Sequence, residues 1–171
     1  MATFAKLDEN NIVLEVLVVN DSDVINPSTQ QEDEEYCITN TLIPQMGWSS
    51  WKQTSANTRG GVHYDPNTNV PSDDQSKALR ANYPGIGDLY DSSNNIFIRG
   101  SKSFPSWSLN TTTGFYEAPV PSPGAEYQID GEYIFPQWDD DNTRWLGKKD
   151  SKVDDNAEYV WNTGTNSWDS L

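Results

Sequence analysis

The sequence predicts a mainly β protein that is built from short hairpins rather than around one large aliphatic core. The first observation is a recurring unit, in which two large residues stand seven positions apart and enclose a polar turn. This separation places the two residues opposite each other when the chain folds back on a tight turn. The second observation is the apolar composition: aliphatic residues become scarce after residue 19, whereas the chain has seven Trp and eight Tyr. Each unit is therefore expected to be a hairpin with its own cross-strand pair.

The recurring unit occurs in three full copies and one looser copy. The flanking residues are Tyr90 with Phe97, Trp138 with Trp145, Trp161 with Trp168 and, in the looser copy, Leu109 with Tyr116. Cross-strand pairs of this kind contribute roughly 0.2–1 kcal/mol each. The four tryptophans are candidate contact residues for another protein or for a sugar ring, although hairpin packing requires the same spacing: Trp138, Trp145, Trp161 and Trp168.

The N-terminal stretch predicts an opening hairpin, with strands over residues 3–7 and 12–19 around the polar turn at 8–11. The second strand is apolar on both faces, which predicts a central position in a sheet. Replacing Leu14 with Asp is then expected to unfold this domain. The acidic residues 20–35 fit either a short helix or a plain loop, and two short strands are expected near residues 36–40 and 48–54.

One short helix is predicted over residues 72–81. Ser72 and Gln75 form a capping box, acidic residues fill the first turn, and Lys77 and Arg80 lie in the last. Beyond residue 100 the chain is punctuated by Pro, which is typical of semi-rigid connectors. We therefore expect an N-terminal β-rich domain over residues 1–100, followed by a region of hairpins with Pro-rich connectors over residues 101–171.

The charge and the cysteine content exclude several classes of function. A net charge of −15 with only 11 Lys and Arg argues against nucleic acid and anionic membranes as partners. The single cysteine, Cys37, excludes a disulfide within the chain and a zinc site made of cysteines. The first residues lack a secretion signal, and no apolar run approaches about 20 residues. We expect a chain made in a cytoplasm that acts through other proteins or through self-association.

The residues capable of chemistry do not form a recognisable catalytic pattern. Paired carboxylates at Asp73–Asp74, Asp139–Asp141 and Asp154–Asp155 lie in polar runs, which is typical of solvated hairpin tips rather than of a hydrolase. Asp139–Asn142 could supply calcium ligands but lacks the calcium-loop signature. His63 is the single histidine and has no nucleophile motif near it. No catalytic residue, cofactor or metal is predicted.

Several long segments give the chain its resemblance to a known group of proteins. It resembles the small virion structural proteins of tailed phages that infect marine bacteria, especially cyanophages. The strongest match is residues 74–87, followed by Tyr90, Asp91, Phe97 and Ile98, and further matches are residues 4–14, 51–55, 57–64, 105–110 and 116–119. The chain departs from the pattern in an acidic insertion at 26–35 and in a longer region after Gly124.

The resemblance implies a structural role in the virion without catalytic residues. The chain would be a component of a tail fibre or baseplate appendage, or a decoration of the capsid surface, assembled in the host cytoplasm. Its partners would be other virion proteins and further copies of itself. The alternative is a glycan-binding receptor module that contacts polysaccharide on the host surface.

Overall fold

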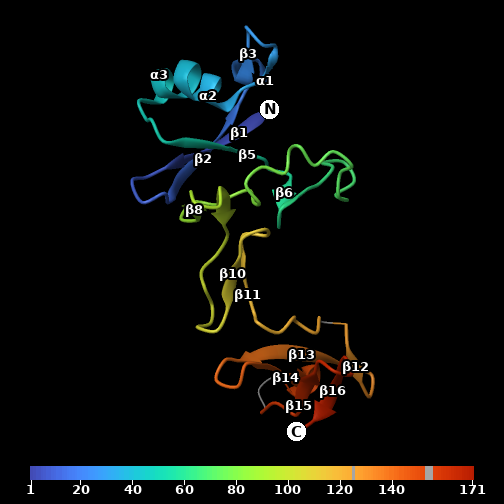
Figure 1. The fold of residues 1–171 in the computed structure, drawn as a ribbon. Helices are drawn as coiled ribbons and strands as arrows, with labels where there is room; N and C mark the ends of the chain where they lie inside the picture. The colour runs from blue at the N-terminus through green and yellow to red at the C-terminus, as the bar shows by residue number, and fades with distance from the viewer. Residues whose placement is uncertain (125, 153–155) are drawn as a thin grey trace. The chain divides into compact units, whose positions relative to one another are not determined.

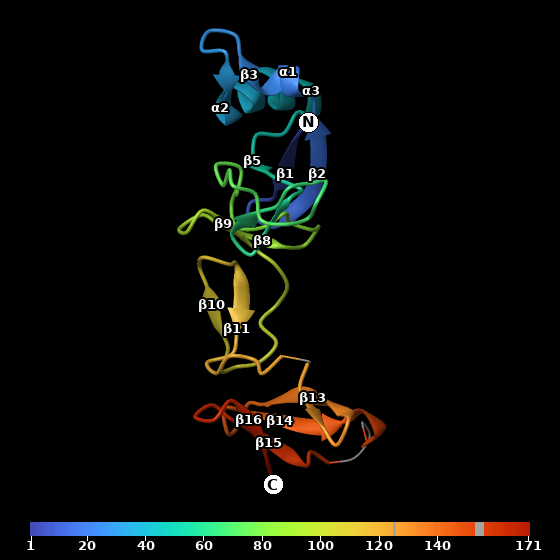
Figure 2. The same ribbon diagram turned by 90° about the vertical axis from the view of Figure 1, so that its right-hand side faces the viewer.

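The computed structural model describes residues 1–124, 126–152 and 156–171, and it confirms a mainly β fold (Figures 1 and 2). The described chain divides into two compact units. Met1–Ser101 and Leu109–Phe115 form the first, and Lys102–Ser108 and Tyr116–Leu171 form the second. The hairpin of β10 (Ser108–Asn110) and β11 (Phe115–Glu117) is thus shared, with its tip in the first unit. The two units are therefore not separated by a single cut of the chain.

The first unit is organised around a three-stranded antiparallel sheet in the order β2-β1-β5. Its elements are β1 (Ala2–Leu7), β2 (Val13–Val19), α1 (Asp21–Val24), β3 (Ile25–Asn26), β4 (Gln31–Glu32), α2 (Glu34–Cys37), η1 (Ile38–Leu42), α3 (Ile43–Met46), β5 (Trp51–Thr54), β6 (Thr58–Arg59), β7 (Val62–His63), β8 (Leu89–Asp91) and β9 (Ile96–Ile98).

The prediction that the strand over residues 12–19 is central was wrong. The central strand is β1, whose Phe4 and Ala5 are both fully buried, and β2 is an edge strand. On β2, Leu14 is 40% exposed and Val18 is 61% exposed. The expectation that Leu14→Asp unfolds the domain therefore loses its basis, because that side chain already faces water.

Each face of this sheet carries its own small core. On one face, Phe4, Val19 and Trp51 pack with Cys37 and other residues of the helical segment. On the other face, Ala5, Leu7 and Val13 pack against Tyr90 and Phe97 of the β8–β9 hairpin. Figure 1 shows the helices on one side of the sheet and β8 on the other.

The helical segment replaces the strand that was expected near residues 36–40. Asp33 caps α2 by accepting a 3.0 Å hydrogen bond from the backbone N–H of Tyr36, and the chain continues through the π-helical stretch η1 into α3. Gly47 ends α3 in the left-handed conformation, with φ of 64°. Leu42 follows Ile38 by four positions, and both side chains lie in the core against the sheet. This helical spacing extends beyond residues 36–40, so those five residues alone do not indicate a helix.

Residues 72–81 do not form the helix that the capping pattern predicts. The side chain of Gln75 donates to the backbone carbonyl oxygen of Ser72 at 2.5 Å, whereas a capping box needs it to accept from the backbone N–H of that residue. The same side chain pairs with the backbone of His63, as acceptor at 2.8 Å and as donor at 2.9 Å. Arg80 and Ala81 then adopt positive φ, which no α-helix tolerates over two residues. Contacts with distant residues thus override the local helix signal.

One type of turn occurs six times in the described part of the chain. In each copy an Asn or Asp side chain accepts a hydrogen bond from a backbone N–H two or three residues later, and the residue four positions later has positive φ. The acceptors are Asn26, Asp65, Asp91, Asn110, Asp139 and Asn162, and the residues with positive φ are Gln30, Asn69, Asn95, Gly114, Thr143 and Asn166.

This turn explains the seven-residue spacing. The residues on either side of it pair directly: Tyr90 with Phe97, Trp138 with Trp145, and Trp161 with Trp168. Their ring centroids lie 5.3, 5.0 and 5.3 Å apart, respectively. The predicted cross-strand aromatic pairs are confirmed.

The side chain of Asn82 ties three hairpins of the first unit together. Asn82 is fully buried, and its amide nitrogen donates to the carbonyl oxygens of Phe97 at 3.0 Å and Thr113 at 2.7 Å. Its amide oxygen accepts from the backbone N–H of Gly60 at 2.9 Å. A Cβ on Gly114 would lie 2.4 Å from the Asn82 nitrogen, so a side chain at that position would break the arrangement.

The second unit contains a five-stranded antiparallel sheet in the order β12-β13-β14-β15-β16, so every strand pairs with its neighbours in the chain. Its elements are β12 (Gln128–Ile129), β13 (Glu132–Asp139), β14 (Arg144–Lys149), η2 (Asp150–Lys152), β15 (Tyr159–Asn162) and β16 (Ser167–Ser170). Pro136 lies in β13 opposite Gly147, beyond the short β12, where its missing N–H leaves no ladder position empty.

We expect Asn82→Asp to destabilise the first unit by about 2–5 kcal/mol, because a buried carboxylate would face two carbonyl oxygens that lose their donor. Urea unfolding measures the change in the free energy of unfolding, and amide hydrogen exchange in β1 and β9 assigns the change to the first unit. Asn67→Asp is the matched control, since it adds the same charge at an exposed position. Equal stabilities of the two variants would contradict the role assigned to Asn82.

The aspartate turns predict acid sensitivity. The backbone amide of Thr68 lowers the pKa of Asp65, and the side-chain amide of Asn94 lowers the pKa of Asp91. The stability these carboxylates add is present above their unfolded pKa, roughly 4, and is lost as the pH falls through the lower folded pKa. The double variant Asp65→Asn with Asp91→Asn keeps the acceptor oxygens, as Asn110 and Asn162 do naturally.

This double variant should therefore have the melting temperature of the wild type at pH 7. Between pH 7 and pH 3 its melting temperature should fall by less than that of the wild type. Thermal melts at the two pH values give the comparison. A loss as large as that of the wild type would show that these two carboxylates do not carry the acid sensitivity.

Candidate functional site

The register of the five-stranded sheet assigns its residues to two faces of different character. Ile134, Trp138, Trp145 and Gly147 lie on one face, here called the inner face, and so do Trp161 and Trp168. All four tryptophans singled out in the sequence are thus on the same side of one sheet. The residues between them lie on the opposite side, here called the outer face.

Trp138 and Trp145 form a core with Trp107. The centroid of the Trp107 ring lies 6.5 Å from that of Trp138 and 6.4 Å from that of Trp145. Trp138 donates its indole N–H to Ser106 and Asp140, and Trp145 donates to the carbonyl oxygen of Val120 at 2.9 Å. With exposures of 5% and 8%, these two residues hold the unit together and leave little ring surface for a ligand.

Trp161 and Trp168 are half-buried on the same face. Tyr127 packs against Trp161 with ring centroids 4.8 Å apart. Trp168 lies against the backbone of Gly147, where a Cβ would come within 2.8 Å of the indole ring. The packing of the inner face therefore depends on a glycine at this position, and both tryptophans are used largely within the unit.

The outer face is more open, and it carries large apolar side chains beside polar ones such as Gln137, Lys148 and Asp169. Tyr133 and Phe135 alternate with the buried residues of β13 and are 51% and 49% exposed. Phe135 pairs with Lys148, while the adjacent row of the sheet runs through Leu146 and Val160, which are partly exposed. Large apolar side chains on an open sheet face are the feature expected of a surface that another protein covers.

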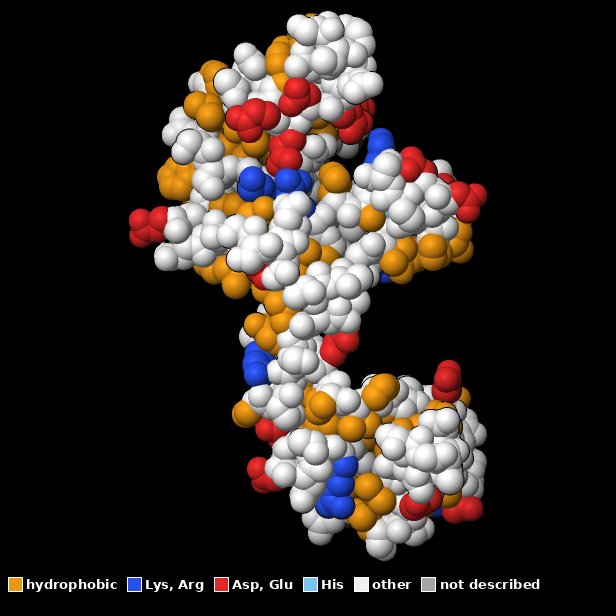
Figure 3. All heavy atoms as spheres, in the orientation of Figure 1, with side chains coloured by type: hydrophobic (Ala, Val, Ile, Leu, Met, Phe, Trp, Pro, Cys, Tyr) orange, Lys and Arg blue, Asp and Glu red, His pale blue; other side chains and the backbone are white. Residues whose placement is uncertain are grey.

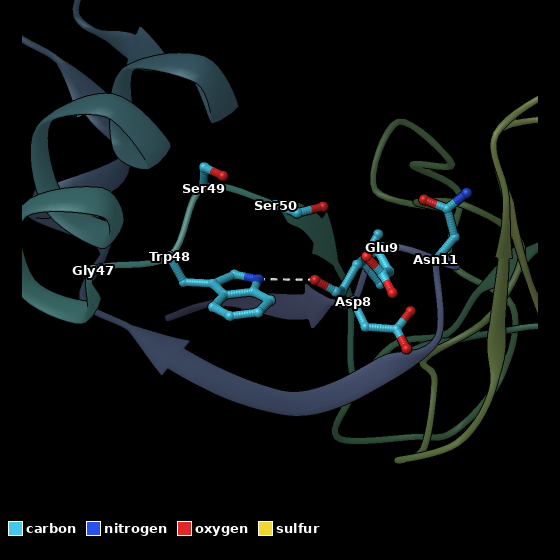
Figure 4. Close-up of a pocket in the computed structure, with 8 residues that line it drawn as sticks. Asp8, Glu9, Asn11, Gly47, Trp48, Ser49 and Ser50 are labelled. Atoms are coloured by element: carbon cyan, nitrogen blue, oxygen red, sulfur yellow. Dashed lines mark hydrogen bonds between the residues drawn. The ribbon is translucent and has the colours of Figure 1, made fainter.

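A hollow of about 600 Å³ in the first unit offers a second surface (Figure 4). It lies between the turn after β1 and the segment that follows α3, and its lining includes Asp8, Glu9 and Asn11. Trp48 is 37% exposed here, donates its indole N–H to the carbonyl oxygen of Leu7 at 2.8 Å, and has Lys6 over its ring at 4.9 Å. An aromatic ring beside carboxylates and amides is a combination that can hold a sugar.

Three of the carboxylates considered for calcium or hydrolysis, Asp74, Asp139 and Asp140, form hydrogen bonds within the fold. Asp139 accepts from Asn142 and from Arg144 at 2.9 Å, and hydrogen bonding from the Arg144 side chain lowers its pKa. Asp140 accepts from Ser106, whose hydroxyl lowers its pKa. Asp74 caps its own turn through the backbone N–H of Ser76.

The ring of His63 lies beside the hydroxyl of Ser55, with Nδ1 and Oγ 3.5 Å apart. The backbone of His63 pairs with Gln75, and Asp154 and Asp155 lie outside the described residues. In the described part of the chain, no three His, Cys, Asp or Glu side chains gather as metal ligands would. Nor is any helix described there long and apolar enough to cross a membrane.

The sequence analysis does not predict the outer face, because the Pro pattern beyond residue 100 indicates connectors rather than a long strand. The run of three large residues from Tyr133 to Phe135 was the signal that could have found it, because successive residues of a strand point to opposite faces of the sheet. The aromatic spacing also does not predict two of the six turns, those at Asn26 and Asp65. Their flanks are not aromatic pairs, since Ile25 pairs with Glu32 and Tyr64 with Pro71.

No family model, curated protein or solved structure matches this chain.

Proposed function

We propose that this chain is a structural component of a tailed-phage virion, and that it acts by docking onto another virion protein through the outer face of its five-stranded sheet. The observation that carries the proposal is the contrast between the two faces. The inner face is filled by tryptophans, whereas Tyr133 and Phe135 project from the outer face about half exposed. The resemblance of the sequence to virion proteins supplies the setting.

The charge of the chain agrees with this mode of action. Acidic side chains are scattered over the face drawn in Figure 3, and basic ones are few. An apolar patch on a strongly acidic protein favours a partner that offers apolar or basic surface, and repulsion between acidic copies keeps them soluble before assembly. A tail-fibre or baseplate position and a capsid-surface position would use the same docking chemistry.

The test of this proposal is the double variant Tyr133→Ser with Phe135→Ser. We expect its incorporation into assembling particles to fall at least about tenfold, as the loss of central apolar anchors does at interfaces. Its melting temperature should stay close to that of the wild type, since both side chains point away from the inner core. Immunoblots of purified particles and thermal melts measure the two effects.

The matched control for this test is Val70→Ser with Ile86→Ser, which removes two exposed apolar residues from the first unit. The control should incorporate normally. Normal incorporation of the Tyr133 and Phe135 variant would refute docking through the outer face.

The alternative function is glycan binding, with host-surface polysaccharide as the ligand. Here the hollow beside Trp48 is the better site, because Trp138 and Trp145 are buried. If the alternative is correct, Trp48→Ala should abolish binding of host polysaccharide in isothermal titration, while Trp48→Phe keeps an aromatic platform and should retain most of it. Absence of binding by the wild-type protein would remove this alternative.

A further inference from the structure

The two edges of the three-stranded sheet are treated differently. At β5, the backbone N–H of Gln53 donates to the Glu34 carboxylate at 2.8 Å, and its carbonyl oxygen accepts from Arg80 at 2.6 Å. Arg80 and Glu34 are themselves joined at 2.7 Å. A pair of charged side chains thus takes the place of a neighbouring strand, which is one way for a protein to close an edge against further pairing.

The edge at β2 has no such closure over most of its length. Within the part of the chain that the structure describes, only the backbone groups of its first residue have partners on this side: the N–H of Val13 donates to the carbonyl oxygen of Asp88, and the carbonyl oxygen of Val13 accepts from the N–H of Gly87. From Glu15 to Val19, β2 pairs with β1 on one side, and no strand of the described chain lies on the other. Figure 2 shows β2 at the margin of the sheet, with β1 between it and β5.

The composition of this free segment is also unusual for an edge. Open edges normally carry Lys, Pro or an inward charge that prevents pairing, yet Glu15 is followed by Val16, Leu17, Val18 and Val19. A β-bulge at Leu14 interrupts the register with β1, so the regular ladder runs over the five residues 15–19. Apart from Glu15, the side chains that β2 contributes to this ladder are apolar on both faces of the sheet, and Val18 is 61% exposed.

A hollow of about 220 Å³ lies directly beside this edge. It is lined by the end of β2, by Leu42 and by residues of α3 that include Met46, which is 41% exposed. A strand added along β2 would cover Val18 and could place an apolar side chain in the hollow. Strand addition of this kind takes its affinity from main-chain hydrogen bonds and its specificity from such hollows.

We propose that the occupant of this edge is a second copy of the same chain, whose β2 pairs antiparallel with the first about a two-fold axis at Leu17. The two three-stranded sheets then form one continuous six-stranded sheet. The axis falls at Leu17 because this residue is the centre of the free segment 15–19, so that all five residues of each copy are paired.

The pattern of residues on β2 is self-complementary in this register. Leu17 faces its own copy, Val16 faces Val18, and Glu15 faces Val19, so the single charge of the segment never meets itself. In an antiparallel pair, opposite residues share a face, and the two cores of one copy therefore continue into those of the other. This interface lies in the first unit, and the proposal does not depend on the virion role.

The net charge gives the association a definite salt dependence. Two chains with a charge of −15 each repel one another, while the contact itself is made by apolar side chains and backbone groups. Raising the salt concentration screens the repulsion and should strengthen the dimer. Docking driven by opposite charges would weaken under the same change.

Sedimentation velocity on the full chain tests the proposal, with Val18→Lys as the variant that closes the edge. The wild type should shift from monomer to dimer as its concentration rises to about 100 μM, and more completely at higher salt. Val18→Lys should raise the dissociation constant at least tenfold, because it places an edge lysine in the new ladder. Val70→Lys is the matched control, being the same change at a residue 55% exposed.

Oxidative cross-linking locates the contact. Leu17→Cys should form a disulfide-linked dimer, since directly opposed residues of an antiparallel pair lie within disulfide range. The native Cys37 should not cross-link, because it is fully buried and burial raises the pKa of its thiol to about 11. A wild type that stays monomeric, a dimer that survives Val18→Lys, or a dimer that Leu17→Cys leaves unlinked would each overturn the proposal.

Discussion

The amide of Asn82 is the interaction on which the first unit depends. Most strands of this unit are two or three residues long, and isolated hairpins of that length are marginal in water. The side-chain amide of Asn82 joins them by hydrogen bonding to Gly60, Phe97 and Thr113. The backbone carbonyl oxygen of Asn82 also accepts from the hydroxyl of Thr54. Because it is fully buried, these bonds are not shared with water, and the hairpins are held in one arrangement.

The features that the sequence predicts correctly are those determined by residues close together in the chain. The pairing of Tyr90 with Phe97, or of Trp161 with Trp168, follows from a turn whose acceptor and left-handed residue lie four positions apart. The edge position of β2 does not follow from its own residues, because it depends on β5 pairing with the far side of β1 and not with β2. Likewise the helix expected at 72–81 is lost because Gln75 bonds to His63 and Arg80 reaches Glu34. Such contacts depend on residues that are far apart in the chain.

The same distinction applies to the candidate surfaces. Aromatic spacing located the tryptophans correctly within hairpins, but it could not tell which face of each hairpin is covered. The segment around Trp107 and Val120 covers the inner face, so Trp138 and Trp145 are buried while Phe135 is open. A residue's exposure is set by what folds over it. The apolar surfaces that remain, on β13 and on β2, are flanked by a strongly acidic chain, which favours defined contacts over indiscriminate association.

The sequential order of strands in the second unit also bears on how the chain folds. From β12 to β16, every strand pairs with the one made just before it, so each step closes only a short loop. The first unit must instead join Thr3 to Thr54 across 51 positions before its central strand is complete. The search for that distant pairing should therefore limit the folding rate of the whole chain, while the C-terminal meander forms hairpin by hairpin as it leaves the ribosome.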